Sequence, residues 1–254
     1  MINFSNNKPV VCVQGLGFVG SAMSTAVAMA NNSEGEPIFN VIGIDLNNIT
    51  GIKRVKNINS GCFPFETTDN VLVDSLKRCV LNGNLKATHD EDCYTVADVI
   101  VVDVHLDIPF KDDEPDLNFS GLINAITSIT TRAKAGALII VETTVPPGTC
   151  EKIVIPTVNQ ILKDRGMPED SIYIAHSYER VMPGKDYLSS IVNFWRVFAG
   201  KNKESGDKCE EFLGKVINID EYPLTRLTST TASETSKVLE NTYRAVNIAL
   251  MDEW

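Results

Sequence analysis

Short apolar runs alternate along the chain with longer segments in which apolar residues recur at helical spacing. The runs predicted as strands are Val10–Gln14, Val41–Asp45, Val99–Val104, Ala137–Glu142 and Ile172–Ala175. The segments predicted as helices are Val19–Ala30, Asn70–Leu81, Leu117–Lys134, Thr149–Lys163 and Lys203–Leu213. Residues 99–102 are apolar at every position, which is typical of parallel strands covered by helices on both faces. The alternation predicts an α/β fold with a doubly wound, mostly parallel sheet.

The pattern changes after Lys215. A short apolar run at Val216–Ile219 leads into one long helical segment from Thr230 to Trp254, and the sequence stops while this helix is still running. We expect residues 1–218 to form one domain, and residues 219–254 to be a linker and the start of a further helical unit. An uncapped last helix predicts either packing on a partner chain or continuation in a longer protein.

Charge and composition exclude several classes of protein. The chain has 254 residues, with 23 Lys and Arg against 33 Asp and Glu, which gives a formal net charge of −10. Nothing here would neutralise a row of phosphates, so we expect no nucleic-acid partner. The most apolar stretch is broken by Asp98 and Asp103, so no segment is predicted to span a membrane. Six cysteines without a CxxC pair predict reduced thiols in a cytoplasmic protein and no metal centre.

A glycine-rich turn directly follows the first predicted strand and opens a helix rich in small residues. Gly15 would permit the tight turn, and Gly17 would let a pyrophosphate approach the backbone. Gly20 would let the helix pack closely on the strand. Free N–H groups at the helix start, beside Phe18 and Val19, would face the anion. The turn predicts dinucleotide binding.

An acidic residue at the end of the next strand supports this prediction. Asp45 lies 25 residues after Gly20, because the polar stretch Asn31–Asn40 lengthens the connecting loop. Its carboxylate would accept hydrogen bonds from the adenosine ribose hydroxyls and repel a 2′-phosphate, which favours NAD over NADP. The domain is therefore predicted to be Rossmann-like. A methyltransferase, which uses a similar glycine turn and acid, is the alternative.

Two further polar clusters follow later strands, where ligands sit in sheets of this type. Glu142–Gly148 places the hydroxyl of Thr144 at the cofactor or the substrate, or forms only a rigid proline loop. Glu179–Gly184 presents a carboxylate, Glu179, that could act on a water or orient a hydroxyl group. The alternative for this second cluster is a solvated corner.

The final helix contributes a third cluster. Lys237 and Asn241 are four residues apart, so they share one face of the helix. An ammonium and an amide that converge on one point could stabilise a developing oxyanion. Alternatively Lys237 faces solvent, as most helix lysines do, because Glu240 and Arg244 beside it look like an ordinary ion pair.

In this order, the motifs resemble the nucleotide-sugar dehydrogenase family, whose members include UDP-glucose, UDP-N-acetylmannosamine and UDP-N-acetylglucosamine dehydrogenases. Gly15–Gly20 with Asp45 is similar to the family's cofactor fingerprint. Glu142–Gly148 resembles its E-S-T-V-P-x-G loop, and Glu179–Gly184 its P-E-R-V-x-P-G segment. The other matching segments are Ile58–Glu66, Gly83–Thr88, Ala97–Ile100 and Glu234–Glu253. The resemblance covers nearly the whole chain.

The resemblance implies NAD-dependent oxidation of the C6 alcohol of a UDP-sugar to the uronic acid, for polysaccharide biosynthesis. The form of the second loop favours a UDP-N-acetylhexosamine over UDP-glucose as the substrate. Lys237 and Asn241 would stabilise the oxyanion, while Thr144 and Glu179 would position water and substrate, with Thr144 also at the cofactor. The last helix would begin the family's central dimerisation helix, which implies a homodimer.

Some residues depart from the family motifs. Tyr178 replaces a proline, Thr143 a serine and Asp252 an asparagine. The family's nucleophile is a cysteine in a G-G-x-C motif beyond this helix, and the sequence contains no such motif. Cys62 and Cys150 lie near the expected ligand loops but not at that position. We expect the chain to bind NAD and to be unable to complete the oxidation unaided.

Two other functions stay open on the sequence alone. A β-hydroxyacid dehydrogenase also combines a Rossmann domain with a helix that carries Lys and Asn four residues apart, and it needs no cysteine. It would not require the two proline-containing loops. A non-catalytic NAD-binding module would bind the cofactor tightly, and Lys237→Ala would have no enzymatic effect.

Overall fold

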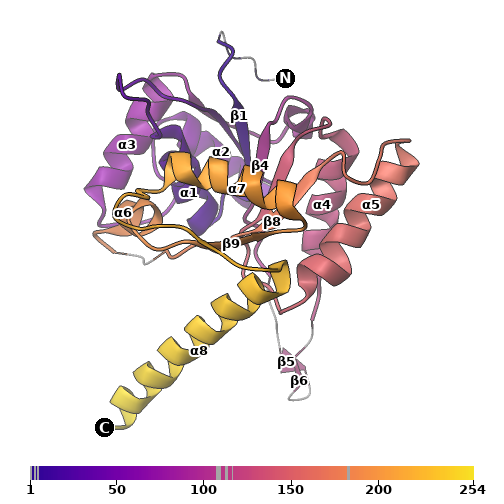
Figure 1. The fold of residues 1–254 in the computed structure, drawn as a ribbon. Coiled ribbons are helices and arrows are strands. Elements are labelled where there is room, and N and C mark those ends of the chain that lie inside the picture. The colour runs from indigo at the N-terminus through magenta and orange to yellow at the C-terminus, as the bar shows by residue number, and fades with distance from the viewer. Residues whose placement is uncertain are drawn as a thin grey trace.

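The computed structural model describes residues 2, 4, 6–106, 110–111, 114–115, 117–181 and 184–254. Within this part of the chain, an eight-stranded sheet in the order β10-β9-β8-β7-β4-β1-β2-β3 forms the centre of the fold (Figure 1). Its strands are β1 (Val10–Gln14), β2 (Asn40–Ile44), β3 (Leu85–Thr88), β4 (Val99–Val102), β7 (Leu138–Val141), β8 (Tyr173–His176), β9 (Val197–Gly200) and β10 (Thr225–Arg226). A separate pair joins β5 (Phe110–Lys111) to β6 (Glu114–Pro115).

Helices connect the strands and cover both faces of the sheet. They are α1 (Phe18–Ala28), α2 (Ile49–Asn59), α3 (Asn70–Leu81), α4 (Ser120–Arg132), α5 (Ile155–Asp164), α6 (Tyr187–Val192), α7 (Lys203–Val216) and α8 (Thr230–Glu253). Two shorter helical segments are η1 (Glu91–Thr95) and η2 (Cys150–Val154), and η2 continues directly into α5.

The strand order confirms the predicted doubly wound, Rossmann-like sheet. β3, β2, β1, β4, β7 and β8 are parallel to one another, whereas β9 is antiparallel to β8. The chain builds outward from β1 to β3 and then crosses back to place β4 on the other side of β1. In such sheets, ligands bind beyond the carboxyl ends of the strands where the order reverses. The loops after β1 and β4 therefore mark the expected site.

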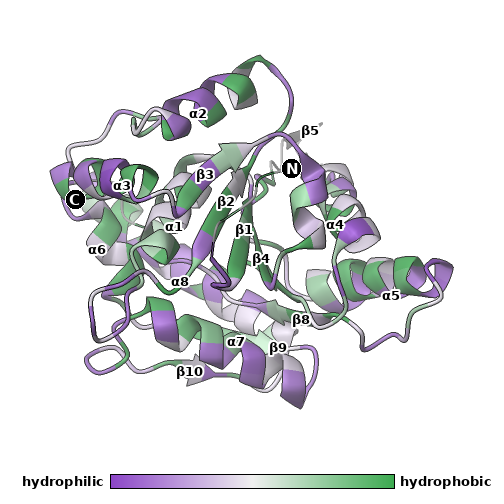
Figure 2. Ribbon diagram, turned by 90° about the horizontal axis from the view of Figure 1, so that it is seen from above, coloured by the Kyte–Doolittle hydropathy of each residue, from purple (hydrophilic) through white to green (hydrophobic). Residues whose placement is uncertain are grey.

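Both faces of the central strands are buried, which explains their continuous apolar runs. Val11 and Val13 of β1 belong to the core shared with α1 and α3, and Cys12 between them belongs to the core shared with α4 and α5. Successive residues of a strand point to opposite faces, so both cores need apolar residues. Figure 2 shows these hydrophobic strands between α1 and α3 on one side and α4 and α5 on the other.

The predicted elements are found, with small shifts at their ends. The strand Val10–Gln14 and the helix Asn70–Leu81 have the predicted bounds. β2 ends one residue earlier than predicted, so Asp45 is the first residue beyond the strand. The helices α2 and α6 and the strands β3, β9 and β10 of the sheet were not among the predicted elements. β10 pairs with β9, so the segment expected to be a linker adds a strand to the same sheet.

The last helix leaves the body of the molecule. Thr230, Ser233, Glu234 and Lys237, in the first turns of α8, are buried, whereas every residue from position 241 onward is exposed. Figure 1 shows α8 extending away from the sheet to the C-terminus. Only the beginning of this helix can therefore contribute side chains to the body of the protein.

Candidate functional site

The glycine turn has the backbone geometry that the sequence predicts. Gly15 has a φ of +95°, and a Cβ there would lie 2.5 Å from the carbonyl oxygen of Asp103. A Cβ at Gly20 would lie 1.9 Å from the carbonyl oxygen of Gly15. Both positions therefore need glycine for the fold itself. At Gly17, by contrast, a Cβ would meet no described atom within 4 Å, so the turn leaves open space there.

The start of α1 offers backbone donors toward this open space. Gly17 caps the helix without a side chain, and the first turn contains no acidic residue. The first N–H groups of an α-helix, here those of Phe18, Val19 and Gly20, have no acceptor within the helix. Together with the positive end of the helix dipole, they suit a phosphate group.

Asp45 lies directly beside this turn, at the carboxyl end of β2. It is 8% exposed, and its carboxylate accepts a hydrogen bond from the Leu46 N–H at 2.8 Å and forms an ion pair with Arg54 at 3.2 Å. Asp45 lines a pocket of about 290 Å³ together with Gln14, the last residue of β1, and His89. A ribose in this pocket would find the carboxylate already fixed in place.

A second pocket, of about 320 Å³, lies on the other side of the glycine turn. Its lining combines the turn with the loops after β4, β7 and β8, and includes Gly17, Phe18, Val19, Asp103, Glu142, Thr144 and Glu179. A dinucleotide whose diphosphate lay on the start of α1 would have one pocket for each of its nucleosides. The residues present therefore fit NAD.

Lys237 lies against Glu179 at this second pocket. Its ammonium donates to the Glu179 backbone carbonyl at 2.8 Å and contacts the carboxylate at 3.3 Å. The ammonium also lies 5.2 Å from the centre of the Tyr178 ring, and the residue is only 7% exposed. Burial lowers the pKa of Lys237, and the neighbouring Glu179 opposes that effect. Lys237 therefore does not face solvent, which was its alternative interpretation.

A buried ion pair lies next to these residues and was not predicted. Arg196 contacts the Glu142 carboxylate at 2.5 Å and the Tyr178 carbonyl at 3.1 Å, and the side chains of Arg196 and Glu142 are each 1% exposed. Asp103 lies close to Glu142, and burial together with the carboxylates of Glu142 and Glu179 raises the pKa of Asp103 well above its usual range. Glu142 Oε2 and Asp103 Oδ2 are buried and have no hydrogen-bond partner among the described atoms. A proton shared by the two acids would satisfy both oxygens.

The sequence contained a pattern from which the positions of Asp103 and Glu142 could have been predicted. Asp103 and Glu142 each follow closely on a strand that is otherwise apolar, so both lie at the carboxyl edge of the sheet. Arg196 directly precedes β9, a strand that was not predicted, and its pairing with Glu142 depends on a contact between residues 54 positions apart.

The other predicted site residues lie in different environments. Thr144 is exposed and lines the second pocket, whereas Thr143 donates its hydroxyl hydrogen toward the carbonyls of Val102 and Val104. Asn241 is exposed, lies one helical turn beyond Lys237 and is not among the residues that line the pocket. Met182 and Pro183, in the predicted Glu179–Gly184 cluster, lie outside the described residues.

The two cysteines near the expected ligand loops lie in different environments. Cys150 is fully buried, and burial raises its pKa well above the usual range of a thiol. Cys62 is exposed, and its sulfur lies 3.8 Å from the Ser60 carbonyl oxygen, on the loop after α2. A reactive cysteine needs a stabilised thiolate, and Cys150 lacks it.

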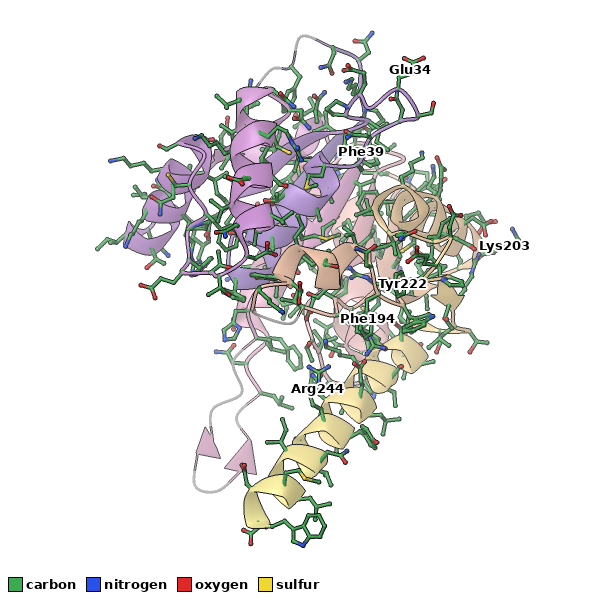
Figure 3. The ribbon with its side chains drawn as sticks, turned by 90° about the vertical axis from the view of Figure 1, so that its left-hand side faces the viewer. Glu34, Phe39, Phe194, Lys203, Tyr222 and Arg244 are labelled. Carbon is green, nitrogen blue, oxygen red and sulfur yellow. The ribbon has the colours of Figure 1, made fainter. Side chains whose placement is uncertain are left out.

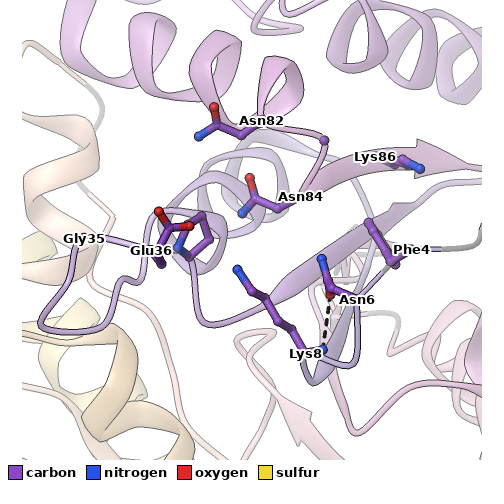
Figure 4. Close-up of a pocket in the computed structure, with 10 residues that line it drawn as sticks. Phe4, Asn6, Lys8, Gly35, Glu36, Asn82, Asn84 and Lys86 are labelled. Carbon is purple, nitrogen blue, oxygen red and sulfur yellow. Dashed lines mark hydrogen bonds between the residues drawn. The ribbon is translucent and has the colours of Figure 1, made fainter.

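A larger cavity opens at the opposite edge of the sheet. It measures about 550 Å³ and lies before the amino ends of β1, β2 and β3, where Lys8, Glu36, Asn84 and Lys86 line it (Figure 4). It contains no predicted site residue. Among the described residues, no group of three or more His, Cys, Asp or Glu side chains is arranged to hold a metal ion. A search of the same residues finds no helix with the length and apolar character needed to cross a membrane.

Comparison with known proteins finds relatives that all belong to one family of dehydrogenases. A model of the UDP-glucose/GDP-mannose dehydrogenase family, NAD binding domain, matches residues 9–217. A UDP-N-acetyl-D-mannosamine dehydrogenase from Methanocaldococcus jannaschii is 34% identical over 244 residues, which is 96% of this chain and 50% of the relative. The corresponding enzyme from Pyrococcus horikoshii is 30% identical and is covered over 52% of its length. The chain thus spans about half the length of the curated relatives it matches.

Solved structures agree with this fold. The crystal structure of an NDP-N-acetyl-D-galactosaminuronic acid dehydrogenase from Methanosarcina mazei Go1 superimposes with a TM-score of 0.80 at 28% identity, covering 97% of this chain and 49% of that one. A UDP-D-ManNAc dehydrogenase from Pyrococcus horikoshii gives a TM-score of 0.77, also at 28% identity, over 96% of this chain and 52% of that one.

Proposed function

The chain belongs to the UDP-glucose/GDP-mannose dehydrogenase family, and from this premise we propose that it takes part in oxidising the C6 alcohol of a UDP-sugar to the uronic acid with NAD. The matched region is the NAD-binding domain of that family. The observation that carries the proposal is the second pocket, where the glycine turn, Thr144 and Glu179 meet and Lys237 is buried against Glu179. A module that only bound NAD would have no need of a buried lysine there.

NAD would be held by Gly15, Gly17, Phe18, Val19, Gly20, Asp45 and Thr144. The N–H groups at the start of α1 would neutralise the diphosphate, and Asp45 would bind the adenosine ribose. Bound at this site, NAD supplies the hydride acceptor that alcohol oxidation requires. The negative charge of Asp45 also disfavours a 2′-phosphate, so NAD is preferred over NADP.

The protein's own residues would handle the proton and the charge. Oxidation of an alcohol passes through an oxygen that becomes negative as its proton leaves. A buried ammonium, Lys237, stabilises such an oxygen more strongly than an exposed one would, because the surroundings screen it less. Asn241 would add an amide donor, while Glu179 and Thr144 would position water and substrate. The contact between Lys237 and Glu179 links the two groups directly.

The named relatives narrow the substrate class. Those with 30–34% identity are UDP-N-acetyl-D-mannosamine dehydrogenases, so a UDP-N-acetylhexosamine is the preferred substrate, ahead of UDP-glucose. A uronic acid product suits polysaccharide biosynthesis. All six cysteines are free in the structure, which fits a protein of the reducing cytoplasm.

We further propose that α8 packs against a second copy of the chain to form a homodimer. Its exposed half carries large apolar side chains, namely Leu239, Tyr243, Val246, Ile248, Leu250, Met251 and Trp254. An open groove along the helix, lined by residues that include Tyr243, Ile248 and Met251, has a volume of about 620 Å³. Figure 3 shows α8 running away from the region of Phe194, with side chains along both edges of its later turns. Contiguous apolar surface of this kind is typical of interaction sites. Light scattering coupled to gel filtration would give the mass of a dimer if this proposal is right.

Calorimetry and a reduction assay test the function. We expect heat of binding with NAD+ and weaker binding of NADP+. We also expect the full-length protein to reduce NAD+ when a UDP-N-acetylhexosamine is supplied, and not when small hydroxy acids are supplied. Thermal stabilisation by S-adenosylmethionine, with none by NAD+, would contradict the proposal.

A further inference from the structure

One buried carboxylate joins α8 to the loop that carries Thr144. Glu234 is 0% exposed, and its two oxygens accept hydrogen bonds from the backbone N–H groups of Gly148 at 2.5 Å and Cys150 at 2.7 Å. The contacts join residues 86 and 84 positions apart. Burial raises the pKa of Glu234, and the two N–H donors counteract that shift by stabilising the charged form.

The N–H groups that Glu234 binds lie where a helical segment begins. η2 starts at Cys150, and Thr149 before it provides no side-chain cap. Donors at such a position need an acceptor from elsewhere, and a carboxylate there also interacts favourably with the helix dipole. Glu234, which belongs to α8, supplies both the hydrogen-bond acceptor and the negative charge. These two hydrogen bonds therefore connect α8 to the segment that follows Thr144, Val145 and the two prolines, and we call this connection the tie.

Glu234 and Lys237 are on the same face of α8. They are three residues apart, which corresponds to a rise of about 4.5 Å along the axis. The neighbouring positions of the helix are also bound to the body, since Ser233 contacts His176 at 2.8 Å and Ser236 contacts the Tyr178 hydroxyl at 3.0 Å. Of Ser233, Glu234 and Ser236, Glu234 is the charged one, and its two hydrogen bonds go to the loop after β7.

We propose that Glu234 is a positioning residue that ties α8 to the Gly148–Cys150 turn and so holds the Lys237 ammonium on Glu179. Its importance for catalysis rests on the proposed function. The positioning itself concerns contacts within this chain and can be tested without turnover. Loss of the tie would leave α8 attached through the Ser233, Ser236 and Lys237 contacts with residues 176–179 and the Arg180–Glu240 ion pair, none of which lies on the loop that carries Thr144.

The test is the NMR signal of the Lys237 ammonium in the ¹⁵N-labelled 254-residue chain, assigned with Lys237→Arg. Hydrogen-bonded and buried, this ammonium exchanges slowly with water and should give a cross-peak that exposed lysines lack. We expect Glu234→Gln to abolish or shift this cross-peak, because one of the two accepting oxygens becomes an amide nitrogen, which cannot accept from an N–H donor. Glu151→Gln is the matched control, since Glu151 is exposed beside the same turn. We expect it to leave the cross-peak unchanged.

Two further readouts separate positioning from folding and from function. If Glu234→Gln does not fold, Glu234→Asp keeps the charge but shortens the side chain, and the Lys237 signal should shift in that variant. An unchanged Lys237 cross-peak in a folded Glu234 variant overturns the proposal, whatever the activity. Absence of NAD binding in the unmodified chain would instead contradict the proposed function and leave the Lys237 measurement valid.

Discussion

The ammonium of Lys237 binds Glu179 twice, through the backbone carbonyl at 2.8 Å and the carboxylate at 3.3 Å, although the two residues are 58 positions apart. The carbonyl of the preceding residue, Tyr178, is bound by Arg196 at 3.1 Å. Two buried cations therefore fix two successive carbonyls at the carboxyl end of β8. This arrangement gives the segment that carries Glu179 a defined position beside the pocket.

Replacing Lys237 should separate binding from chemistry. Lys237→Met keeps an apolar stem of similar length but removes the charge that would stabilise the alkoxide. We expect UDP-sugar-dependent NAD+ reduction to fall on the order of 100-fold or more. The affinity for NAD+ should be unchanged, because the glycine turn and Asp45 bind elsewhere. Steady-state rates and calorimetry check this, with the exposed Lys215→Met as control. Full activity in Lys237→Met would contradict the assigned role.

Two glycines of one turn should respond to alanine in opposite ways. A Cβ at Gly17 meets no described atom within 4 Å, so Gly17→Ala should fold with a stability loss of under about 1 kcal/mol. Its methyl group would occupy the space of the diphosphate, and we expect NAD+ affinity to fall on the order of 100-fold, or about 2.8 kcal/mol.

Gly20→Ala should show the reverse. Its Cβ would lie 1.9 Å from the Gly15 carbonyl oxygen, so the helix must move and the free energy of unfolding should fall by about 2–3 kcal/mol. Urea unfolding and calorimetry on both variants make the comparison. Tight NAD+ binding by Gly17→Ala would show that the diphosphate lies somewhere else.

Asp45 should decide the choice between the two nicotinamide cofactors. Asp45→Asn removes a charged acceptor, and we expect NAD+ affinity to fall about 10-fold or more. The same change frees Arg54, which is paired with Asp45 at 3.2 Å, to meet a 2′-phosphate, so the affinity for NADP+ should rise. Calorimetry with both cofactors measures the ratio, and Asp74→Asn, at an exposed position of α3, is the control. An unchanged ratio would place the adenosine ribose away from Asp45.

The sequence predicted the sheet well, because buried parallel strands need apolar residues on both faces and therefore stand out. The glycine turn was equally clear, since Gly15 and Gly20 are required by the backbone itself. The helix α2 was missed because only Gly51, Val55 and Ile58 of it are buried, and its start depends on a cap by Asn48. A short helix or strand with few buried residues shows little periodicity of apolar positions, so the sequence does not reveal it.

The chemistry at the pocket was predicted in part. Lys237 was singled out by its spacing from Asn241, yet its partner is Glu179 on another element, while Asn241 is exposed. The Glu142–Arg196 pair, and the tie from Glu234 to the Gly148–Cys150 turn, depend on how distant segments pack. Such contacts leave no periodic signal, because each requires only one residue at one place.

His176 should make the protein sensitive to acid. It is fully buried at the end of β8, with Nδ1 2.8 Å from the Ser233 hydroxyl oxygen. Burial, with a smaller contribution from Lys237, lowers its pKa from 6.5 to about 4, against the opposing effect of the Thr143 backbone carbonyl, which favours the protonated ring. Since the unfolded chain binds the proton more readily than the folded one, stability is fully present above pH 6.5 and falls as the pH drops toward about 4.

The size of this effect follows from the shift. A difference of this size between the folded and unfolded pKa of His176 corresponds to about 3 kcal/mol across the window. In His176→Asn, whose amide can still bond the Ser233 hydroxyl, this contribution is absent. We therefore expect the free energy of unfolding in urea to fall more steeply with decreasing pH in the unmodified chain than in the variant. Because every other titrating group is common to both proteins, parallel curves would mean that His176 is protonated equally in the folded and unfolded states, and its burial would then have to be relieved by a local opening between β8 and α8.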